Sequence, residues 1–300
     1  MSAAPPTAGA HAESPRSLSG FASVAVLGTG LIGGSFALAL RAAFPEAVVA
    51  GWDRPEVLQR AAERGAITHA APSLAEAVAG ADLIYVALPI GVTLDLLPEI
   101  ARHSPAGALV TDAASTKSAI CRAARELFRG GAQFLGGHPL AGRETSGIEH
   151  ADAALFRCAK YVLVGEPSLA AAARFETLLR ALGAEPVWLD AESHDWALGI
   201  VSHLPQLAAV ALAAVVGDET DETGLPLSLA ASGLRDALRL AGSPYALWRD
   251  VCLTNRENVA RSLERLVQAL EHLRASLASR ELEAQFDAAN RVYKSLREMD

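Results

Sequence analysis

The chain of 300 residues predicts an α/β fold, in which a doubly wound, mostly parallel sheet is followed by an all-helical domain. From residue 21 to residue 190, short apolar strand patterns alternate with helical patterns, as in parallel strands joined by right-handed crossovers. Residues 191–300 show helical patterns alone. We therefore expect a domain boundary near residue 190, and a disordered leader over residues 1–20, which are rich in Ala, Pro and Ser.

Each predicted element follows from its local pattern. Short apolar runs, which suit strands covered on both faces, occupy residues 23–27, 47–52, 82–88 and 108–111, with further short strands at 133–137, 161–164 and 187–189. Helical patterns occupy residues 35–43, 55–64, 73–79, 92–102 and 116–128. Pro89 ends the third of these strands, because proline has no N–H to donate to a sheet ladder.

A glycine-rich turn, Gly28-Thr-Gly30-Leu31-Ile32-Gly33, joins the first strand to the first helix. At this spacing the first glycine permits the tight turn, the second lets the backbone approach a pyrophosphate, and the third lets the helix pack closely on the strand. The helix that follows directs unpaired N–H groups at the phosphates. The first domain is therefore predicted to be of the Rossmann type, with Gly28, Gly30, Leu31, Ile32 and Gly33 binding a dinucleotide cofactor.

The second strand ends at Asp53, 25 residues after Gly28. An acid at this position accepts hydrogen bonds from ribose hydroxyls and repels a 2′-phosphate, which favours NAD over NADP. Arg54 leaves the alternative open, because an arginine there could meet a 2′-phosphate or stack on adenine. Pro89, at the end of the third strand, is expected to line the nicotinamide pocket.

The composition argues against several classes of protein. With a net charge of −8, a nucleic-acid-binding protein is not expected, since such proteins normally present a basic surface. No uninterrupted apolar run reaches the roughly 18 residues of a membrane span, and no secretory signal is expected in the leader. Cys121, Cys158 and Cys252 are too widely spaced for a disulfide framework or a metal cluster. We therefore expect a cytoplasmic protein without a bound metal.

Residues just beyond the carboxyl ends of parallel strands are the candidates for chemistry, because ligands bind at that edge. His138 follows two glycines and precedes a proline in an expected strand-end loop, where a group that titrates near neutrality suits proton transfer. Ser115 is expected to hydrogen-bond the same substrate atom, to cap the helix that starts near residue 116, or both. Lys117 is expected to be structural or to steer phosphate.

Two segments of the helical domain predict assembly. Residues 198–216 form a nearly all-apolar helix interrupted by Pro205, and such a helix is buried, often in a subunit interface. Apolar residues also recur at intervals of four and three from Val259 to Leu277, as in a coiled-coil seam. We favour a homodimer through the helical domain, and the alternative is a helical hairpin within one chain.

Six ordered motifs between residues 21 and 297 resemble prephenate and arogenate dehydrogenases. They are Gly-Thr-Gly-Leu-Ile-Gly-Gly-Ser (28–35), Thr-Asp-Ala-Ala-Ser-Thr-Lys (111–117), Gly-Gly-His-Pro-Leu-Ala-Gly-Arg-Glu (136–144), Val-Ser-His-Leu-Pro (201–205), Gly-Leu-Arg-Asp-Ala-Leu-Arg-Leu-Ala (233–241) and Trp-Arg-Asp (248–250) with Asn255. The resemblance implies NAD-dependent oxidative decarboxylation of prephenate to 4-hydroxyphenylpyruvate in tyrosine biosynthesis. Hydride would leave C4 for NAD⁺, the 4-hydroxyl proton would pass to His138 with Ser115 as second partner, and CO₂ would be lost as the ring becomes aromatic.

The same resemblance implies which residues bind the substrate. Arg239 matches the arginine that grips a substrate carboxylate, and Arg235 lies one turn earlier, where it binds substrate or is structural. Glu144 and Trp248 match residues that gate or line the active site, although Trp248 could equally be a core residue. His194 matches a substrate-side position.

Two further positions leave questions open. Gln206 stands where some relatives carry histidine, so the recognition of the substrate side chain is open. His203 is explained as well by a structural role as by a substrate role, since Pro205 frees a backbone carbonyl one turn earlier.

Alternatives to prephenate oxidation remain open. Arogenate, or both substrates, could be accepted, because one amino group separates the two compounds. β-Hydroxyacid dehydrogenases also join a Rossmann domain to a helical dimer domain, but they rely on a lysine in the helical domain, and none lies between Lys160 and Lys294. A non-catalytic NAD sensor is disfavoured by the presence of both His138 and Arg239.

Overall fold

The computed structural model of the chain describes residues 20–142, 145–220 and 222–298. The chain divides into two compact units, residues 1–194 and 195–300, and the division falls inside helix α7 (Ala191–Leu198). Residues 1–19 of the predicted leader lie outside the described residues.

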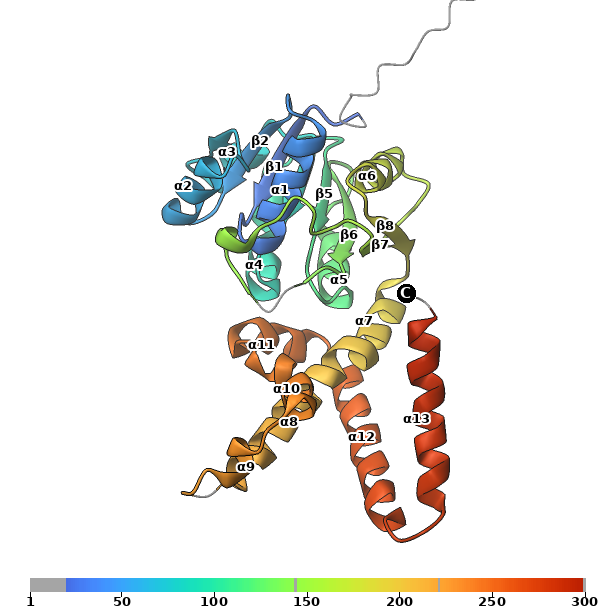
Figure 1. Cartoon of the computed structure of the whole chain (residues 1–300). Coiled ribbons are helices and arrows are strands. Elements are labelled where there is room, and N and C mark those ends of the chain that lie inside the picture. The colour runs from blue at the N-terminus through green and yellow to red at the C-terminus, as the bar shows by residue number, and fades with distance from the viewer. Residues whose placement is uncertain (1–19, 143–144, 221, 299–300) are drawn as a thin grey trace, which may run out of the picture. The chain divides into compact units, whose positions relative to one another are not determined.

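One eight-stranded sheet forms the centre of the first unit, with the strand order β3-β2-β1-β4-β5-β6-β7-β8. Figure 1 shows helices lying against this sheet. Neighbouring strands run parallel except β6 and β7, so the predicted mostly parallel sheet is confirmed. The strands are β1 (Ser23–Leu27), β2 (Val48–Trp52), β3 (His69–Ala70), β4 (Leu83–Val86), β5 (Leu109–Asp112), β6 (Gln133–Pro139), β7 (Lys160–Val164) and β8 (Glu185–Trp188).

Helices cover both faces of this sheet. They are α1 (Leu31–Ala43), α2 (Pro55–Glu63), α3 (Leu74–Val78), α4 (Ile90–His103), α5 (Ser118–Leu127) and α6 (Ala170–Ala181). Along β1, Val24 and Val26 belong to the core cluster that contains residues of α1, α2 and α6, whereas Ala25 and Leu27 belong to the cluster that contains residues of α3 and α4. Because successive side chains point to opposite faces, a strand covered on both sides is apolar throughout, which explains the continuous apolar runs in the sequence.

Three elements of the first unit are absent from the predicted set: β3, α6 and the 3-10 turn η1 (Ile148–His150). Strand β3 has two residues, His69 and Ala70, both exposed, so it carries no apolar pattern. Helix α6 buries Phe175, Leu178 and Leu179, whose spacing suits a helix, yet the sequence patterns above place only strands in this part of the chain.

Strand β6 is longer than predicted and contains His138. The antiparallel pairing with β7 continues through His138 opposite Val162 and Pro139 opposite Tyr161. The expectation that His138 lies in a loop beyond the strand is therefore wrong, because β7 provides a partner strand along this part of the chain. The Leu140 N–H donates to the Lys160 carbonyl at 2.8 Å, so the connection between β6 and β7 starts and ends at the same edge of the sheet.

The described residues of the second unit form helices joined by turns and loops and contain no strand, as predicted. After α7 come the π-turn η2 (Gly199–His203), α8 (Leu204–Asp218), α9 (Leu225–Ser228), α10 (Ser232–Leu238), the 3-10 turn η3 (Arg239–Gly242), α11 (Tyr245–Thr254), α12 (Arg256–Ser276) and α13 (Glu281–Arg297). Helices α12 and α13 form an antiparallel hairpin (Figure 1).

Residues Ala191–Asp218 form one continuous helical stretch across α7, η2 and α8, and the π-turn ends two residues before Pro205. By length and composition alone this stretch could cross a membrane. Its most apolar 18 residues have a mean hydropathy of 1.8, and 22% of them are buried in the structure. This stretch is not an uninterrupted apolar run, because His203 and Gln206 fall inside it. A single such helix is weak evidence for a membrane protein, since helices of soluble proteins meet the same criterion.

Much of the apolar surface of the second unit is exposed in a single chain. On α12 the seam starts with the buried Val259, but Leu270 is 54% exposed and Leu277, directly after the helix, is 70% exposed. On α13, Phe286 and Tyr293 are also exposed. The packing of α12 against α13 therefore leaves a part of the predicted seam uncovered.

Candidate active site

The glycine turn after β1 has the geometry expected of a cofactor loop. Gly28 has a φ of +89°, and a Cβ there would lie 2.4 Å from the Ala87 carbonyl oxygen. A Cβ on Gly33 would lie 1.9 Å from the Gly28 carbonyl oxygen, so α1 packs against the turn at a distance that only glycine permits. By contrast, a Cβ on Gly30 would meet nothing within 4 Å. The turn is therefore tightly packed on the sheet side and open at Gly30, which fits a bound pyrophosphate.

Asp53, directly after β2, is linked to this turn. One carboxylate oxygen, Oδ2, accepts from the Thr29 N–H at 2.7 Å, and the other, Oδ1, accepts from the Arg54 N–H at 2.7 Å. The Asp53 side chain is 17% exposed, whereas that of Arg54 is 76% exposed. Asp53 thus presents a partly accessible carboxylate beside the turn, as ribose recognition requires, and also orients the turn itself.

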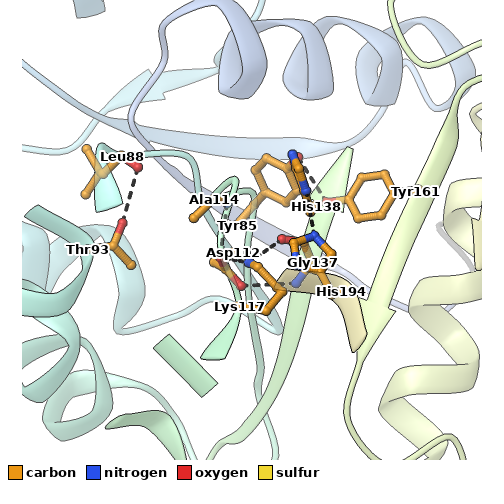
Figure 2. Close-up of polar contacts among 10 residues, drawn as sticks. All are labelled: Tyr85, Leu88, Thr93, Asp112, Ala114, Lys117, Gly137, His138, Tyr161 and His194. Carbon is orange, nitrogen blue, oxygen red and sulfur yellow. Dashed lines mark hydrogen bonds and ion pairs between the residues drawn. The ribbon is translucent and has the colours of Figure 1, made fainter. Parts of the chain in front are cut away.

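The apolar residues predicted to lie against the cofactor have different exposures. Leu31 and Ile32, in the first turn of α1, are half-buried. Pro89 is exposed and forms the N-cap of α4. The Thr93 hydroxyl donates to the Leu88 carbonyl at 3.2 Å, which ties the first turn of α4 to the end of β4 (Figure 2).

His138 contacts a second histidine inside the first unit. Its Nδ1 lies 2.8 Å from Nε2 of His194, and the two rings meet edge to face with their centroids 5.1 Å apart (Figure 2). His138 is 9% exposed and His194 is fully buried in α7. In such a contact one nitrogen donates and the other accepts, so each ring restricts the orientation and the tautomer of the other.

A buried ion pair lies next to His138. Lys117 and Asp112 are both fully buried and form a salt bridge. The Lys117 ammonium group also donates a hydrogen bond to the Gly137 carbonyl at 2.6 Å. The Asp112 carboxylate accepts from the Gly137 N–H at 3.0 Å and from the Ala114 N–H at 3.0 Å (Figure 2). The expectation that Lys117 has a structural role agrees with these contacts.

Two tyrosines pair close to Gly137. The Tyr161 hydroxyl donates to the Tyr85 hydroxyl at 3.1 Å, and the Tyr85 ring stacks on Phe36 with centroids 3.9 Å apart. Burial, chiefly, raises the pKa of both phenols well above the usual value. Both hydroxyls therefore stay protonated at neutral pH. This pair was not among the predicted site residues, and its only sign in the sequence is a tyrosine inside each of two buried strands.

Ser115 lies in the turn after β5 and is half-buried. Helix α5 begins at Ser118, with Lys117 at its N-cap position and no side-chain cap. The interpretation of Ser115 as an N-cap is therefore wrong, because the helix starts later than the sequence pattern indicated. The other interpretation, hydrogen bonding to substrate, stays a prediction.

In the second unit, Arg239 is exposed at the start of η3, and Arg235 is exposed one turn earlier in α10. Gln206 of α8 is buried, and its Nε2 donates to the Leu240 carbonyl at 2.8 Å. The residue that departs from the family pattern therefore holds the backbone directly beside Arg239.

His203 belongs to an interior network of the second unit. It is 1% exposed, and the Trp248 ring meets it edge to face with centroids 5.8 Å apart. The side-chain nitrogen of Asn255 lies 3.1 Å from His203 Nδ1 and donates to the Asp195 carbonyl at 2.7 Å. These contacts favour the structural interpretation of His203 and give Trp248 a packing role as well.

Glu144 lies outside the described residues, so its predicted role rests on the sequence alone. Within the described part of the chain, no three His, Cys, Asp or Glu side chains gather as a metal site would require. The first unit thus brings together His138, His194 and the buried ion pair, none of which is close to another in sequence except Asp112 and Lys117.

Two family models match the chain. The nucleotide-binding domain of prephenate dehydrogenase matches residues 36–185, and the dimerization domain of prephenate dehydrogenase matches residues 190–290. The prephenate dehydrogenase of Lactococcus lactis subsp. cremoris is 39% identical over 263 residues, which cover 87% of this chain and 73% of that protein.

Solved structures agree with these matches. The prephenate dehydrogenase of Aquifex aeolicus, in complex with hydroxyphenyl propionate and NAD⁺, superposes with a TM-score of 0.83 at 27% identity, covering 93% of this chain and 98% of that one. The arogenate dehydrogenase of Synechocystis superposes with a TM-score of 0.78 at 31% identity, covering 91% and 99%. The sequence motifs, the fold and these similarities lead to one conclusion: the chain belongs to the prephenate dehydrogenase family.

Proposed function

We propose that this protein catalyses the NAD⁺-dependent oxidative decarboxylation of prephenate to 4-hydroxyphenylpyruvate, a step of tyrosine biosynthesis. The observation that carries the proposal is the contact between His138 and His194 near the carboxyl end of β6. Strands β1, β4, β5 and β6 run parallel, so this end of β6 lies at the same edge of the sheet as the glycine turn after β1. Membership of the family supports the same reaction.

The residues around the glycine turn would hold the cofactor. Gly28, Gly30 and Gly33 form the pyrophosphate loop, and Asp53 binds the ribose hydroxyls. Further contacts are assigned to Leu31, Ile32, Arg54 and Pro89. When bound, NAD⁺ supplies the acceptor for the hydride that leaves C4 of the substrate.

His138 takes the proton of the 4-hydroxyl group. Because its Nδ1 contacts His194, the transfer is assigned to Nε2. As the C4–H bond breaks, its electron pair leaves as hydride and the oxygen becomes a carbonyl. Cleavage of the bond to the ring carboxylate then releases CO₂, its electron pair completes the aromatic ring, and the phenol oxygen regains a proton. Ser115 is the second partner of this oxygen. His194, which was expected at the substrate side, is fully buried against His138, so it is assigned a role through His138.

Cations are needed for the two carboxylates of prephenate. Arg239 is assigned to one of them, because an exposed guanidinium can bind a carboxylate through two parallel hydrogen bonds. Arg235 is the candidate for the second, and Glu144 and Trp248 are assigned to the lining of the site.

Arogenate is the second candidate substrate. The arogenate dehydrogenase of Synechocystis shares 31% identity with this chain, whereas the prephenate dehydrogenase of Lactococcus lactis shares 39%. Since the two compounds differ in one amino group, the same proton and hydride transfers serve both.

The protein is further proposed to act as a homodimer in the cytoplasm. The dimerization-domain match over residues 190–290 and the exposed apolar side chains of α12 and α13 support the dimer. A second copy would cover this surface, and would also explain the low burial of the apolar stretch Ala191–Asp218. The three free cysteines suit a reducing compartment.

The test is turnover by the purified protein, followed as NADH absorbance, with prephenate and arogenate assayed in parallel and NADP⁺ replacing NAD⁺ in a second series. We expect turnover with prephenate and NAD⁺. A faster reaction with arogenate would reverse the order of the two substrates, and the absence of turnover with both would contradict the proposed function.

A further inference from the structure

Both main-chain polar groups of Gly137, the residue directly before His138, are bonded to the buried ion pair. The Gly137 N–H donates to Asp112 Oδ1 at 3.0 Å, and the Gly137 carbonyl accepts from Lys117 Nζ at 2.6 Å. We propose that Asp112 and Lys117 are positioning residues, which hold β6 in the place that sets the His138 ring for proton transfer. This inference rests on the proposed role of His138 as the catalytic base.

The end of the β5–β6 pairing explains why side chains are needed here. The register pairs Thr111 with Leu135 and stops there. In a strand the N–H and carbonyl of one residue point to the same side, and those of the next residue point to the other. Gly137 therefore faces β5, where the backbone ladder has ended, and the ion pair takes the place of the next strand residue. Without it, two buried polar groups of Gly137 would lose these bonds, which is costly.

Close packing fixes the same segment from the opposite direction. A Cβ on Gly137 would lie 2.4 Å from the Asp112 carbonyl oxygen and 3.0 Å from Thr111 Oγ1. Only glycine therefore lets β6 lie this close to β5, and the ion pair opposes movement away from it. On the other side, β7 pairs His138 with Val162. The backbone that carries the imidazole is consequently held between two neighbours.

Stability alone does not account for this pair. A fully buried lysine and aspartate lose their hydration, and a pair of apolar side chains of similar volume is often equally stable or more stable in such a place. What apolar side chains cannot supply is one donor and one acceptor aimed at the same residue. The ion pair thus provides a defined position of β6.

The first variant is Lys117→Met, which removes the donor to the Gly137 carbonyl while keeping much of the side-chain volume. We expect kcat with prephenate to fall on the order of 10- to 100-fold, because misplacement of a catalytic group by about 1 Å has effects of this size. The dissociation constant for NAD⁺ should stay within a factor of about two of the wild-type value, since the glycine turn lies on another strand. The matched control is Arg129→Met, which removes an exposed ion pair with Glu126 at the other end of α5 and should leave kcat unchanged.

A second variant separates positioning from stability. Lys117→Met leaves Asp112 as an unpaired buried charge, so it also lowers the melting temperature. In the double variant Asp112→Asn/Lys117→Met this charge is removed, and the melting temperature should recover in part while kcat stays low. Recovery of kcat in step with the melting temperature would overturn the inference, because the pair would then act on stability alone.

The third measurement does not depend on turnover. In protein labelled with ¹⁵N-histidine, the ring signals of His138 are assigned by their loss in His138→Asn. We expect these signals to shift or broaden in the double variant and to be unchanged in Arg129→Met. Unchanged signals in the double variant would exclude positioning. If the signals change but His138→Asn retains normal turnover, the role of His138 as base fails while the structural coupling stands.

Discussion

Nδ1 of His138 and Nε2 of His194 lie 2.8 Å apart, although 56 residues separate them in the chain. One comes from strand β6 and the other from helix α7, and both are buried. The contact leaves each imidazole with a preferred tautomer and orientation. The proposed base is thus held with Nδ1 against His194, and proton transfer is assigned to its other ring nitrogen.

His138→Asn is expected to reduce kcat by about 10²- to 10⁴-fold, the usual contribution of a general base. Asparagine keeps a polar side chain but has no group that takes up a proton near neutral pH. The dissociation constant of NAD⁺, measured by fluorescence titration, should be unchanged. Near-normal turnover would remove His138 as the base.

Two variants of His194 differ in whether they keep a polar atom near the position of Nε2. His194→Leu should lower kcat substantially, and His194→Gln should restore part of it, since glutamine can still hydrogen-bond His138 Nδ1. Combined with His138→Asn, neither should cause much further loss, because residues that act as one unit are not additive. Additive losses would show that His194 acts independently of His138.

Arg239→Ala is expected to raise the KM for prephenate on the order of 10- to 100-fold while kcat changes little, as expected for the loss of a charged hydrogen bond in the ground state. Arg235→Ala, one turn away on α10, provides the comparison. If the KM for prephenate rises only in Arg235→Ala, then Arg235 and not Arg239 binds this substrate carboxylate.

Asp53→Ser should narrow the preference for NAD⁺ over NADP⁺, because the charge that repels a 2′-phosphate is lost. Since Asp53 also accepts from the Thr29 N–H, the matched variant is Asp53→Asn, which keeps an acceptor for the turn. Both variants should show the narrower ratio of kcat/KM values for the two cofactors. A ratio unaltered in both would mean that the ribose is recognised elsewhere.

The pair Tyr85–Tyr161 predicts a loss of stability in alkaline solution. Burial raises the pKa of both phenols in the folded state, while in the unfolded chain they titrate near the ordinary tyrosine pKa of about 10. The contribution of the two neutral phenols to the free energy of unfolding is therefore complete below pH 10. It is lost as the pH rises above 10, because the unfolded state then binds fewer protons than the folded state.

The loss should be about 1.4 kcal/mol per pH unit for each tyrosine. In urea unfolding series above pH 10, the free energy of unfolding of the double variant Tyr85→Phe/Tyr161→Phe should decrease less steeply with pH than that of the wild type. The difference should be this amount for each of the two tyrosines. Removing both hydroxyls avoids leaving one of them unpaired. Equal slopes for the variant and the wild type would contradict the burial argument.

Much of the fold is predictable from local patterns. Strand β1 matches its predicted limits, and β2, β4 and β5 match within two residues at each end, because strands covered on both faces are apolar along their whole length. The predicted start of α5 is early by two residues, since Thr116 and Lys117 are buried without being helical. The error at His138 has a different cause: the direction of β7 depends on the whole chain between it and β6.

The candidate site is predictable only in part, for the same reason. Gly28, Gly33 and Asp53 are recognisable because their spacing is a property of one strand-turn-helix unit and the strand after it. His138 is recognisable as a histidine between glycine and proline. Its contact with His194 carries no local signal, and the domain boundary near residue 190 and the roles of the site residues stay predictions.

By itself, the amino-acid sequence determined the fold class, the place of the cofactor turn and the family, because periodicity, glycine spacing and motif order are written along the chain. Only the tertiary structure decided that Asp112 and Lys117 hold Gly137, and that His194 meets His138. The physical reason is that these contacts depend on which strands become neighbours, in which direction they run and where their pairing ends. Those outcomes are settled by the packing of the entire sheet and its helices, to which each local segment contributes only a share.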